Sequence, residues 1–295
     1  MKTLKGKVIY YFKPNEDFNY EVEDGETFWI ETDDCYSGQI SSEKILRTDI
    51  DISIMDAAVG PIRVKNAEAS DIIKIEIIDI KFADHGVMVT SINLGVLGDH
   101  ITAPNTKIIP IEANYAIFNN KIKLPLTPMI GVIGVATKSE EIHCAKPGDH
   151  GGNMDTKEVT IGSIVYLPVF QKGAGLAISD LHACMGDGEL SGTGIETAGK
   201  VKLKVTVIKG KSIKRPIIET KDSIFTIATA KTLEEGIKIA SLDMVTILMK
   251  QLNLNFPDAY RLLSATCDIR ISQVVNGVFT LKVRAPKSLF TNAII

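Results

Sequence analysis

Acidic, imidazole and thiol side chains are concentrated in residues 178–189, which read ISDLHACMGDGE. On a β-strand, residues two apart point to the same face about 6.6 Å apart, so Asp180, His182 and Cys184 are expected to share one face. A carboxylate and an imidazole at this spacing can bind one divalent cation between them, because each ligand bond is only about 2.0–2.2 Å long. The stretch therefore predicts a metal site with Asp180 and His182 as ligands.

The end of this stretch is predicted to be a tight turn. Gly186 and Gly188 flank Asp187, so the chain can fold back and bring Asp187 and Glu189 toward the metal ligands. We expect Glu189 to act as a general base, with Asp187 as a second catalytic candidate. The alternative is a solvated acidic turn, which Asp-Gly pairs commonly form. Eleven of the 23 glycines fall within residues 148–199, which favours tight turns throughout this region.

A second polar cluster, residues 147–155 (PGDHGGNMD), lies about thirty residues upstream. His150 is predicted to be a further metal ligand or a catalytic residue. The backbone N–H groups of Gly151 and Gly152, together with Asn153, are predicted to bind substrate or stabilise an oxyanion. The alternative is that His150 is a loop histidine on a glycine turn and that Asn153 and Asp155 are turn formers.

Two other groups of residues are candidates for the same chemistry. Residues 33–35 (DDC) end a strand-like run, and Asp34 is predicted to add a metal ligand. Cys184 or Cys144 could instead act as a nucleophile, with His182 as the activating base for Cys184. The sequence contains no G-x-S-x-G motif, which disfavours a serine hydrolase of that type.

The elements that must position these residues are predominantly strands. The runs rich in β-branched and aromatic residues are 7–12, 27–32, 61–65, 72–82 and 199–208. No helical crossover separates the strands of the first half, which favours an antiparallel sandwich or barrel over a parallel sheet.

The C-terminal part has a different pattern. Residues 232–235 (TLEE) fit a capping box, and apolar residues then recur at helical spacing to about Leu252. Pro257 suits the first turn of a second helix. Two strands follow, joined by Asn276-Gly277, a strong signal for a two-residue hairpin turn.

The predicted fold class is therefore β-rich α+β, with an antiparallel β-sandwich or barrel core and a small C-terminal helical α/β portion. Residues 1–225 are assigned to the β-rich region, which carries the site motifs of residues 147–196. Residues 226–295 are assigned to the α/β portion, with two helices and a hairpin packed on the first region. We expect one integrated unit without a flexible linker.

Composition excludes several function classes. The hydrophobic fraction of 45% and the charged fraction of 23% are those of an ordinary globular protein. The net charge of −3 gives no reason to expect nucleic acid or a membrane as partner. The four cysteines are scattered without a C-x-x-C pair, as in proteins that keep reduced thiols. We therefore expect a cytoplasmic protein.

Taken together, the motifs resemble those of the acetamidase/formamidase family. The match extends from about residue 5 to residue 290, and its motifs occur in one order along the chain. They are residues 59–62 (VGPI), 128–135 (PMIGVIGV), 150–155 (HGGNMD), 167–169 (LPV), 180–183 (DLHA), 186–189 (GDGE) and 268–275 (DIRISQVV). Residues 56–59 (DAAV) depart from the usual family pattern.

This resemblance implies a mostly β, homodimeric or higher homo-oligomeric enzyme that hydrolyses short amides to carboxylate and ammonia, with a divalent metal in some members. The expected function is a metal-dependent amidohydrolase acting on formamide-like or acetamide-like substrates, in which the cation polarises the carbonyl and activates water. Mixed oxygen and nitrogen ligands favour zinc, with calcium as the alternative or as a second, structural ion. The competing interpretations are a hydrolase of another linear or cyclic C–N bond and a non-catalytic β protein that binds a metal or small ligand.

Overall fold

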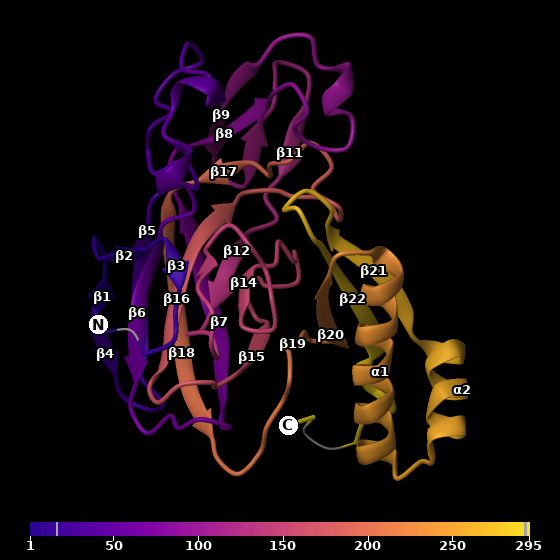
Figure 1. Ribbon diagram of the computed structural model, residues 1–295. Helices are drawn as coiled ribbons and strands as arrows, with labels where there is room; N and C mark the ends of the chain where they lie inside the picture. Colours follow the sequence, from indigo (N-terminus) through magenta and orange to yellow (C-terminus); the bar gives the residue numbers. More distant parts are fainter. Residues whose placement is uncertain (16, 292–293) are drawn as a thin grey trace.

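The computed structural model describes residues 1–15, 17–291 and 294–295, and strands dominate this part of the chain (Figure 1). One sheet of the described residues is mostly antiparallel, with the parallel pair β1–β5 at its edge. Its strand order is β1 (Thr3–Leu4), β5 (Thr27–Thr32), β18 (Gly199–Ile208), β7 (Ile72–Phe82), β15 (Ile164–Pro168), β19 (Ile217–Glu219), β20 (Ser223–Ala230), β22 (Phe279–Pro286) and β21 (Asp268–Gln273).

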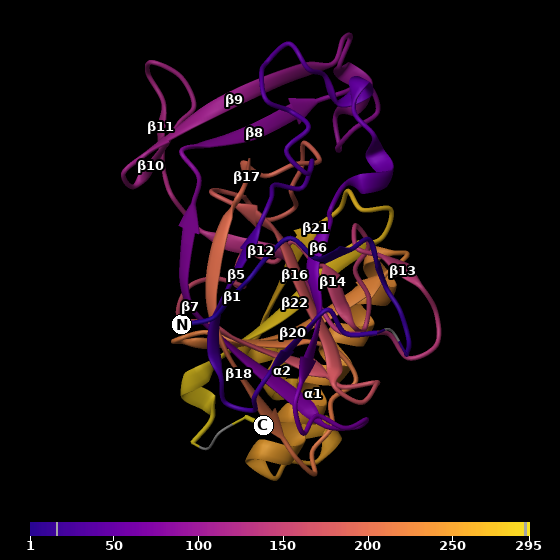
Figure 2. The same ribbon diagram turned by 90° about the vertical axis from the view of Figure 1, so that its left-hand side faces the viewer.

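The second large sheet carries most of the predicted site motifs. Its strand order is β11 (Lys123–Pro125), β10 (Tyr115–Ile117), β9 (Asn105–Glu112), β8 (His85–Thr90), β17 (Glu196–Thr197), β16 (Ala174–His182), β12 (Met129–Gly134) and β14 (Gly151–Asn153). Strand β6 (Ala58–Val64) also pairs with β16, and it pairs in turn with β2 (Val8–Ile9) and β4 (Tyr20–Val22). A small pair joins β13 (Ile142–His143) to β3 (Tyr11–Phe12). Figure 2 shows β8 to β11 above the rest of the molecule.

The two large sheets pack face to face around one hydrophobic core. Buried side chains from β5, β7 and β18 meet side chains from β6, β12 and β16 in a single cluster. Strand β7 illustrates the sequence pattern that builds it, because Ile73, Ile75 and Ile77 are buried while Lys74 and Glu76 are only partly covered. Facing apolar surfaces of this kind define a β-sandwich, so the predicted fold class is confirmed.

The C-terminal helices pack on the end of the first sheet (Figure 1). Helix α1 (Leu233–Leu252) begins after Thr232, whose hydroxyl accepts a hydrogen bond from the backbone N–H of Glu235 at 3.2 Å, as the capping pattern predicted. Helix α2 (Phe256–Thr266) is capped by Asn255. The first sheet continues through β20 into this portion, and the boundary placed at residue 225 falls inside β20. Neither helix is both long enough and apolar enough to cross a membrane.

The predicted two-residue turn at Asn276-Gly277 is wrong, although β21 and β22 do form a hairpin. The strands end at Gln273 and resume at Phe279. The Gln273 side-chain oxygen accepts hydrogen bonds from the backbone N–H groups of Val275 and Asn276, and this organises a longer loop. The loop directs the Asn276 side chain to Asp155, at 2.7 Å, so its geometry serves a contact distant in sequence rather than a tight turn.

Candidate active site

Seven ionisable side chains gather in the interior of the molecule, and we call this group the acidic centre. None is more than 7% exposed, so their charges are removed from water. They come from two strands, from positions close to the ends of three others and from one loop. The members are Cys35 after β5, Asp56 before β6, Asp155 after β14, Asp180 and His182 in β16, Glu189 in the following loop and Glu196 in β17.

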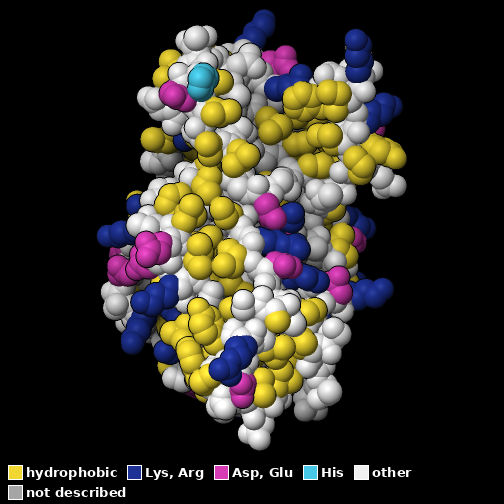
Figure 3. All heavy atoms as spheres, turned by 90° about the vertical axis from the view of Figure 1, so that its right-hand side faces the viewer, with side chains coloured by type: hydrophobic (Ala, Val, Ile, Leu, Met, Phe, Trp, Pro, Cys, Tyr) yellow, Lys and Arg dark blue, Asp and Glu magenta, His cyan; other side chains and the backbone are white. Residues whose placement is uncertain are grey.

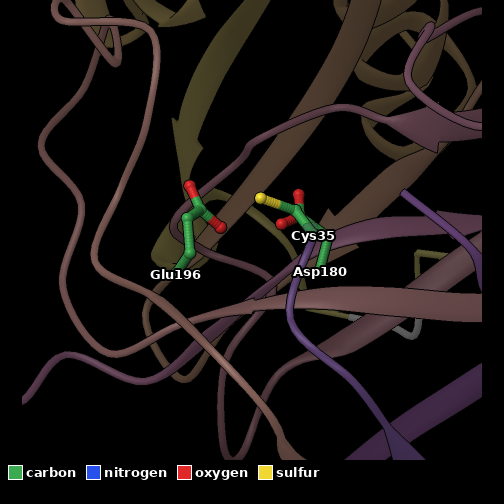
Figure 4. Close-up of side chains that lie close together, drawn as sticks. All are labelled: Cys35, Asp180 and Glu196. Carbon is green, nitrogen blue, oxygen red and sulfur yellow. The ribbon is translucent and has the colours of Figure 1, made fainter. Parts of the chain in front are cut away.

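The acidic centre contains two sets of possible metal ligands. Cys35, Asp180 and Glu196 have ligand atoms within 4.8 Å of one another, and so have Asp155, His182 and Glu189. Figure 4 shows the Cys35 sulfur between the carboxylates of Glu196 and Asp180. Asp56 lies close enough to Asp180, Glu196 and Asp155 for each of them to raise the pKa of its carboxyl, in addition to the larger effect of burial.

His182 joins the two sets. Its Nε2 atom lies 3.1 Å from Asp180 Oδ1 and 2.9 Å from Glu196 Oε2. The Nδ1 atom is buried and has no hydrogen-bond partner among the described residues. The structure therefore brings together Asp180 and His182, which the sequence predicted as metal ligands, and leaves one imidazole nitrogen unpartnered.

Asparagine side chains hold the carboxylates of Asp155 and Asp180. With its amide nitrogen turned toward them, Asn153 donates to Asp155 Oδ2 at 2.9 Å and to Asp180 Oδ2 at 3.2 Å. Asn276 donates to Asp155 Oδ2 at 2.7 Å. Asn153 was expected to bind substrate. In the structure its amide nitrogen already donates hydrogen bonds to two carboxylates of the acidic centre.

The backbone at the acidic centre is strained. Asp56, Asp155, Asp180 and Glu189 have φ angles of 56°, 42°, 58° and 48°, a left-handed region that residues other than glycine seldom adopt. Such conformations cost on the order of 1–3 kcal/mol each and persist where the surrounding structure enforces them, typically at functional sites. Four such residues in one cluster make the acidic centre the candidate functional site.

Gly131 in β12 provides the space for two of the carboxylates. A Cβ atom at this position would lie 2.1 Å from Asp180 Oδ2 and 2.6 Å from Asp155 Oδ1. The glycine-containing run of residues 128–135 was expected to mark close approach of backbone to another group. The group that approaches is this pair of carboxylates.

Burial and mutual repulsion make the acidic centre electrostatically unbalanced. Burial raises the pKa of Asp180 to about 6, and burial together with Asp180 raises the pKa of Asp155 to about 6. Burial lowers the pKa of His182, but Glu196 and Asp180 outweigh it and raise the pKa well above its usual value. Burial and Asp155 raise the pKa of Glu189. Five carboxyl groups thus face one imidazolium, and a cation would neutralise the excess negative charge.

The donor set of the acidic centre fits a divalent metal ion. It offers carboxylate oxygens, the unpartnered His182 Nδ1 atom, a buried Glu189 Oε2 atom that also lacks a hydrogen-bond partner among the described residues, and the Cys35 thiol. Imidazole and thiolate suit zinc and related transition ions, whereas carboxylates alone suit calcium.

The structure does not bring His150 to the acidic centre. Its ring packs against Phe12, with ring centroids 4.8 Å apart, and lies between Gly148 and Gly152. Within residues 1–15, 17–291 and 294–295, none of the identified hydrogen bonds or ion pairs connects this ring to the acidic centre, and burial lowers its pKa to about 4. The Gly151 N–H donates to Gly148 O at 3.1 Å, so the loop itself uses it. The roles of His150, Gly151 and Gly152 stay predictions.

Asp34 and Asp187 are also engaged elsewhere. Asp34 precedes Cys35, but its carboxylate accepts a hydrogen bond from the Gly38 N–H at 2.9 Å and belongs to neither set of ligands. Asp187 lies 2.6 Å from the fully buried Lys282 Nζ and 2.9 Å from Lys157 Nζ. Burial opposes ionisation of Asp187, but the two ammonium groups prevail and lower its pKa. Such a carboxylate is suited to fixing the turn that carries Glu189.

Four members of the acidic centre lie outside the site residues predicted from the sequence, namely Cys35, Asp56, Asp155 and Glu196. Asp155 was classed as a turn former, and Cys35 was noted only as a neighbour of Asp34. The signal that could have found Glu196 is an isolated acid among apolar and small residues, since residues 192–199 read GTGIETAG. A lone acid in such a run is more often buried with a partner than solvated.

The arrangement is that of a β-sandwich protein with a buried acidic centre containing candidate metal ligands, and comparison with known proteins specifies the family. A model of the acetamidase/formamidase family matches residues 5–145 and 139–292. Since the match covers almost the entire sequence, the chain belongs to this family.

Three similar proteins illustrate the relationship. The formamidase of Methylophilus methylotrophus is 27% identical over 261 residues, which are 67% of this chain and 64% of that protein. This chain therefore spans less than two thirds of its length. The crystal structure of an acetamidase from Bacillus halodurans is 40% identical with a TM-score of 0.95 and covers 97% of both chains. That of a predicted acetamidase/formamidase from Thermoanaerobacter tengcongensis is 41% identical with a TM-score of 0.93, covering 96% of this chain and 94% of that one.

We predict that replacing Asp180 by Asn stabilises the metal-free protein at neutral and higher pH. The pKa of Asp180 is about 6 in the folded state, whereas its reference value is 3.8. Between pH 3.8 and about pH 6 the folded state therefore binds more protons than the unfolded state. Stability therefore falls as pH rises from about 4 to about 6 and stays low above that range. Asp180→Asn removes this cost and should raise the free energy of unfolding by about 1–3 kcal/mol at pH 8 in chelator.

Urea unfolding at pH 4 and pH 8 measures this effect, with the exposed Asp17→Asn as matched control. The difference between Asp180→Asn and wild type should be small at pH 4 and large at pH 8. Equal or lower stability of Asp180→Asn at pH 8 would contradict the electrostatic account.

We also predict that Lys282 and Lys157 contribute very differently, although both contact Asp187. Lys282 is fully buried and also pairs with Glu158, whereas the Lys157 side chain is 39% exposed. Lys282→Met leaves the largely buried Glu158 without a cation and Asp187 with only Lys157, and should cost about 3–5 kcal/mol. Lys157→Met should cost at most about 1 kcal/mol. Adding Glu158→Gln and Asp187→Asn to Lys282→Met should restore stability, and failure of this rescue in urea unfolding would exclude charge burial as the cause.

Proposed function

We propose that this protein is a metal-dependent amidohydrolase that cleaves linear amides to a carboxylate and ammonia or an amine. The observation that carries the proposal is the acidic centre, where five buried carboxyl groups surround one imidazole and where His182 Nδ1 and Glu189 Oε2 lack hydrogen-bond partners among the described residues. Membership of the acetamidase/formamidase family supports the reaction class. The relatives named formamidase and acetamidase support small amides as substrates.

The residues proposed to hold the cation are Asp180, His182 and Glu196, with Cys35 beside them. Asp180 and Glu196 approach His182 Nε2 from two strands, and Cys35 completes a set with both acids. The donors of this set favour zinc, and calcium is a candidate for a second position formed mainly by carboxylates. When bound, the cation supplies Lewis-acid polarisation of the amide carbonyl and activation of water.

Glu189 is proposed to move the protons. It is the member of the acidic centre that also lines an open cavity, so it lies between the buried ligands and an entering substrate. Its carboxylate accepts a proton from the attacking water and then donates it to the departing nitrogen, which otherwise leaves poorly. Asn153 and Asn276 keep Asp155 and Asp180 directed into the centre while this happens.

The expected consequence is that hydrolysis depends on metal and on Asp180. Dialysis against a strong chelator should abolish ammonia release from formamide and acetamide, and zinc should restore it. Asp180→Ala should lose both the bound metal, measured by elemental mass spectrometry, and at least 99% of kcat/KM, because a ligand and a fixed charge are removed together. Full activity of folded Asp180→Ala would exclude the proposal.

His150 provides a discriminating control, because sequence and structure suggest different roles for it. Its ring lies against Phe12 and outside both ligand sets, so His150→Ala should retain the metal even if its stability falls. Loss of metal from folded His150→Ala would restore this residue as a ligand. An inactive but metal-loaded wild-type protein would favour the non-catalytic binding protein among the alternatives.

A further inference from the structure

A cavity of about 570 Å³ opens beside the acidic centre, between the sandwich and the β10–β11 hairpin. Glu189 and Gly194 form part of its lining. A Cβ atom on Gly194 would lie 2.6 Å from His182 Nδ1, so the imidazole is directly behind this part of the wall. The cavity is therefore the space through which a substrate reaches the proposed catalytic group.

The walls of this cavity are predominantly apolar. They are contributed by β8, the β10–β11 hairpin and the loop between β16 and β17. On the face shown in Figure 3, hydrophobic side chains gather in the upper part of the molecule, where Figure 1 places β8, β9 and β11. The apolar lining residues are Met88, Phe118, Leu124, Met185, Leu190 and Ile195.

The charges around the cavity exclude an anionic substrate. Among the residues that line it in the described chain there is no lysine or arginine. Its acids are Glu189 and Asp187, and Asp187 is already paired with Lys282 and Lys157. A carboxylate on the substrate would therefore meet negative charge without a cation to bind it. A neutral molecule with one polar end directed at Glu189 fits this environment.

The cavity is much larger than the smallest amides. Acetamide has four non-hydrogen atoms, which occupy roughly 100 Å³ if each takes about the 30 Å³ that a water molecule takes in the liquid. Most of the apolar wall would then face water. Each additional methylene that displaces this water should favour binding about fourfold.

We propose that the cavity binds the apolar chain of a neutral amide, about four to eight carbons long, and that Leu124 and Phe118 of the β10–β11 hairpin set the preferred length. This inference rests on the proposed amide hydrolysis, whose reaction it specifies further. The amide end lies at Glu189 and the chain extends along Met185 and Met88 toward the hairpin.

The first test compares zinc-loaded wild-type protein on acetamide, butyramide and hexanamide. We expect kcat/KM to rise by at least tenfold from acetamide to hexanamide. N-butylacetamide forms a second arm, because a rise there instead places the chain on the nitrogen side of the amide. Hydrolysis of acetamide with no rise in either arm overturns the chain-binding inference and leaves the proposed function standing. Hydrolysis of no amide at all overturns both.

The second test uses two tryptophan variants of the same hairpin. Leu124 lines the cavity, whereas Ile122 does not and is 45% exposed. Leu124→Trp should fill the cavity and lower the ratio of hexanamide to acetamide kcat/KM at least tenfold. The matched Ile122→Trp should leave that ratio within about twofold of wild type. An equal effect of both variants overturns the assignment of Leu124.

A binding measurement gives a readout that does not depend on turnover. The protein with ¹³C-labelled methionine methyl groups is titrated with hexanamide and with acetamide. Hexanamide should shift the signals of Met88 and Met185, assigned by Met→Leu substitution, at concentrations where acetamide does not. Shifts confined to other methionines overturn the proposal.

Discussion

Mutual repulsion among buried carboxylates is the constraint on which the rest of this structure depends. Asp56, Asp155, Asp180, Glu189 and Glu196 are held together where water cannot screen them, with His182 as the cationic partner within the group. Left to relax, such side chains would turn away from one another or remain protonated. The fold prevents the first response by fixing the backbone of four of them in left-handed conformations. A bound cation would prevent the second, which is why we propose a metal site here instead of a structural ion-pair network.

The acidic centre also explains why the C-terminal portion belongs to the active site as well as to the fold. The β21–β22 hairpin contributes Asn276, whose amide binds Asp155, and Ser272, whose hydroxyl contacts Thr156 at 2.9 Å. Lys282 on β22 fixes Asp187 two residues before Glu189, and Gly188 exchanges backbone hydrogen bonds with Ser272 and Val274. The first sheet runs without a break from the sandwich into the C-terminal portion and fixes these residues relative to the sandwich. Separating the C-terminal portion would therefore release the turn that carries Glu189, the proposed base.

The sequence predicts the local features of this protein well. Alternation of isoleucines predicts β7, the capping pattern predicts the start of α1, and spacing by two predicts that the side chains of Asp180 and His182 lie close together. These predictions succeed because each rests on neighbours in the chain. Cys35, Asp56, Asp155 and Glu196 could not be selected in the same way, since they converge only after two sheets have packed. His150 shows the opposite case, in which a conspicuous motif leads to a ring that contacts Phe12 edge to face.

Chemistry and substrate selection are carried by different parts of the fold. The proposed ligands lie on β16, β17 and rigid loops of the sandwich, where a displacement of one ångström would separate donor atoms that now lie within hydrogen-bonding distance. The β10–β11 hairpin, which forms one wall of the cavity, lies at the edge of the second sheet, whereas Glu189 and Gly194 line the cavity on the side of the acidic centre. Side chains can change at such an edge without disturbing the buried carboxylates. In the proposed reaction, the hairpin would therefore decide the length of the bound chain without any change in the ligands.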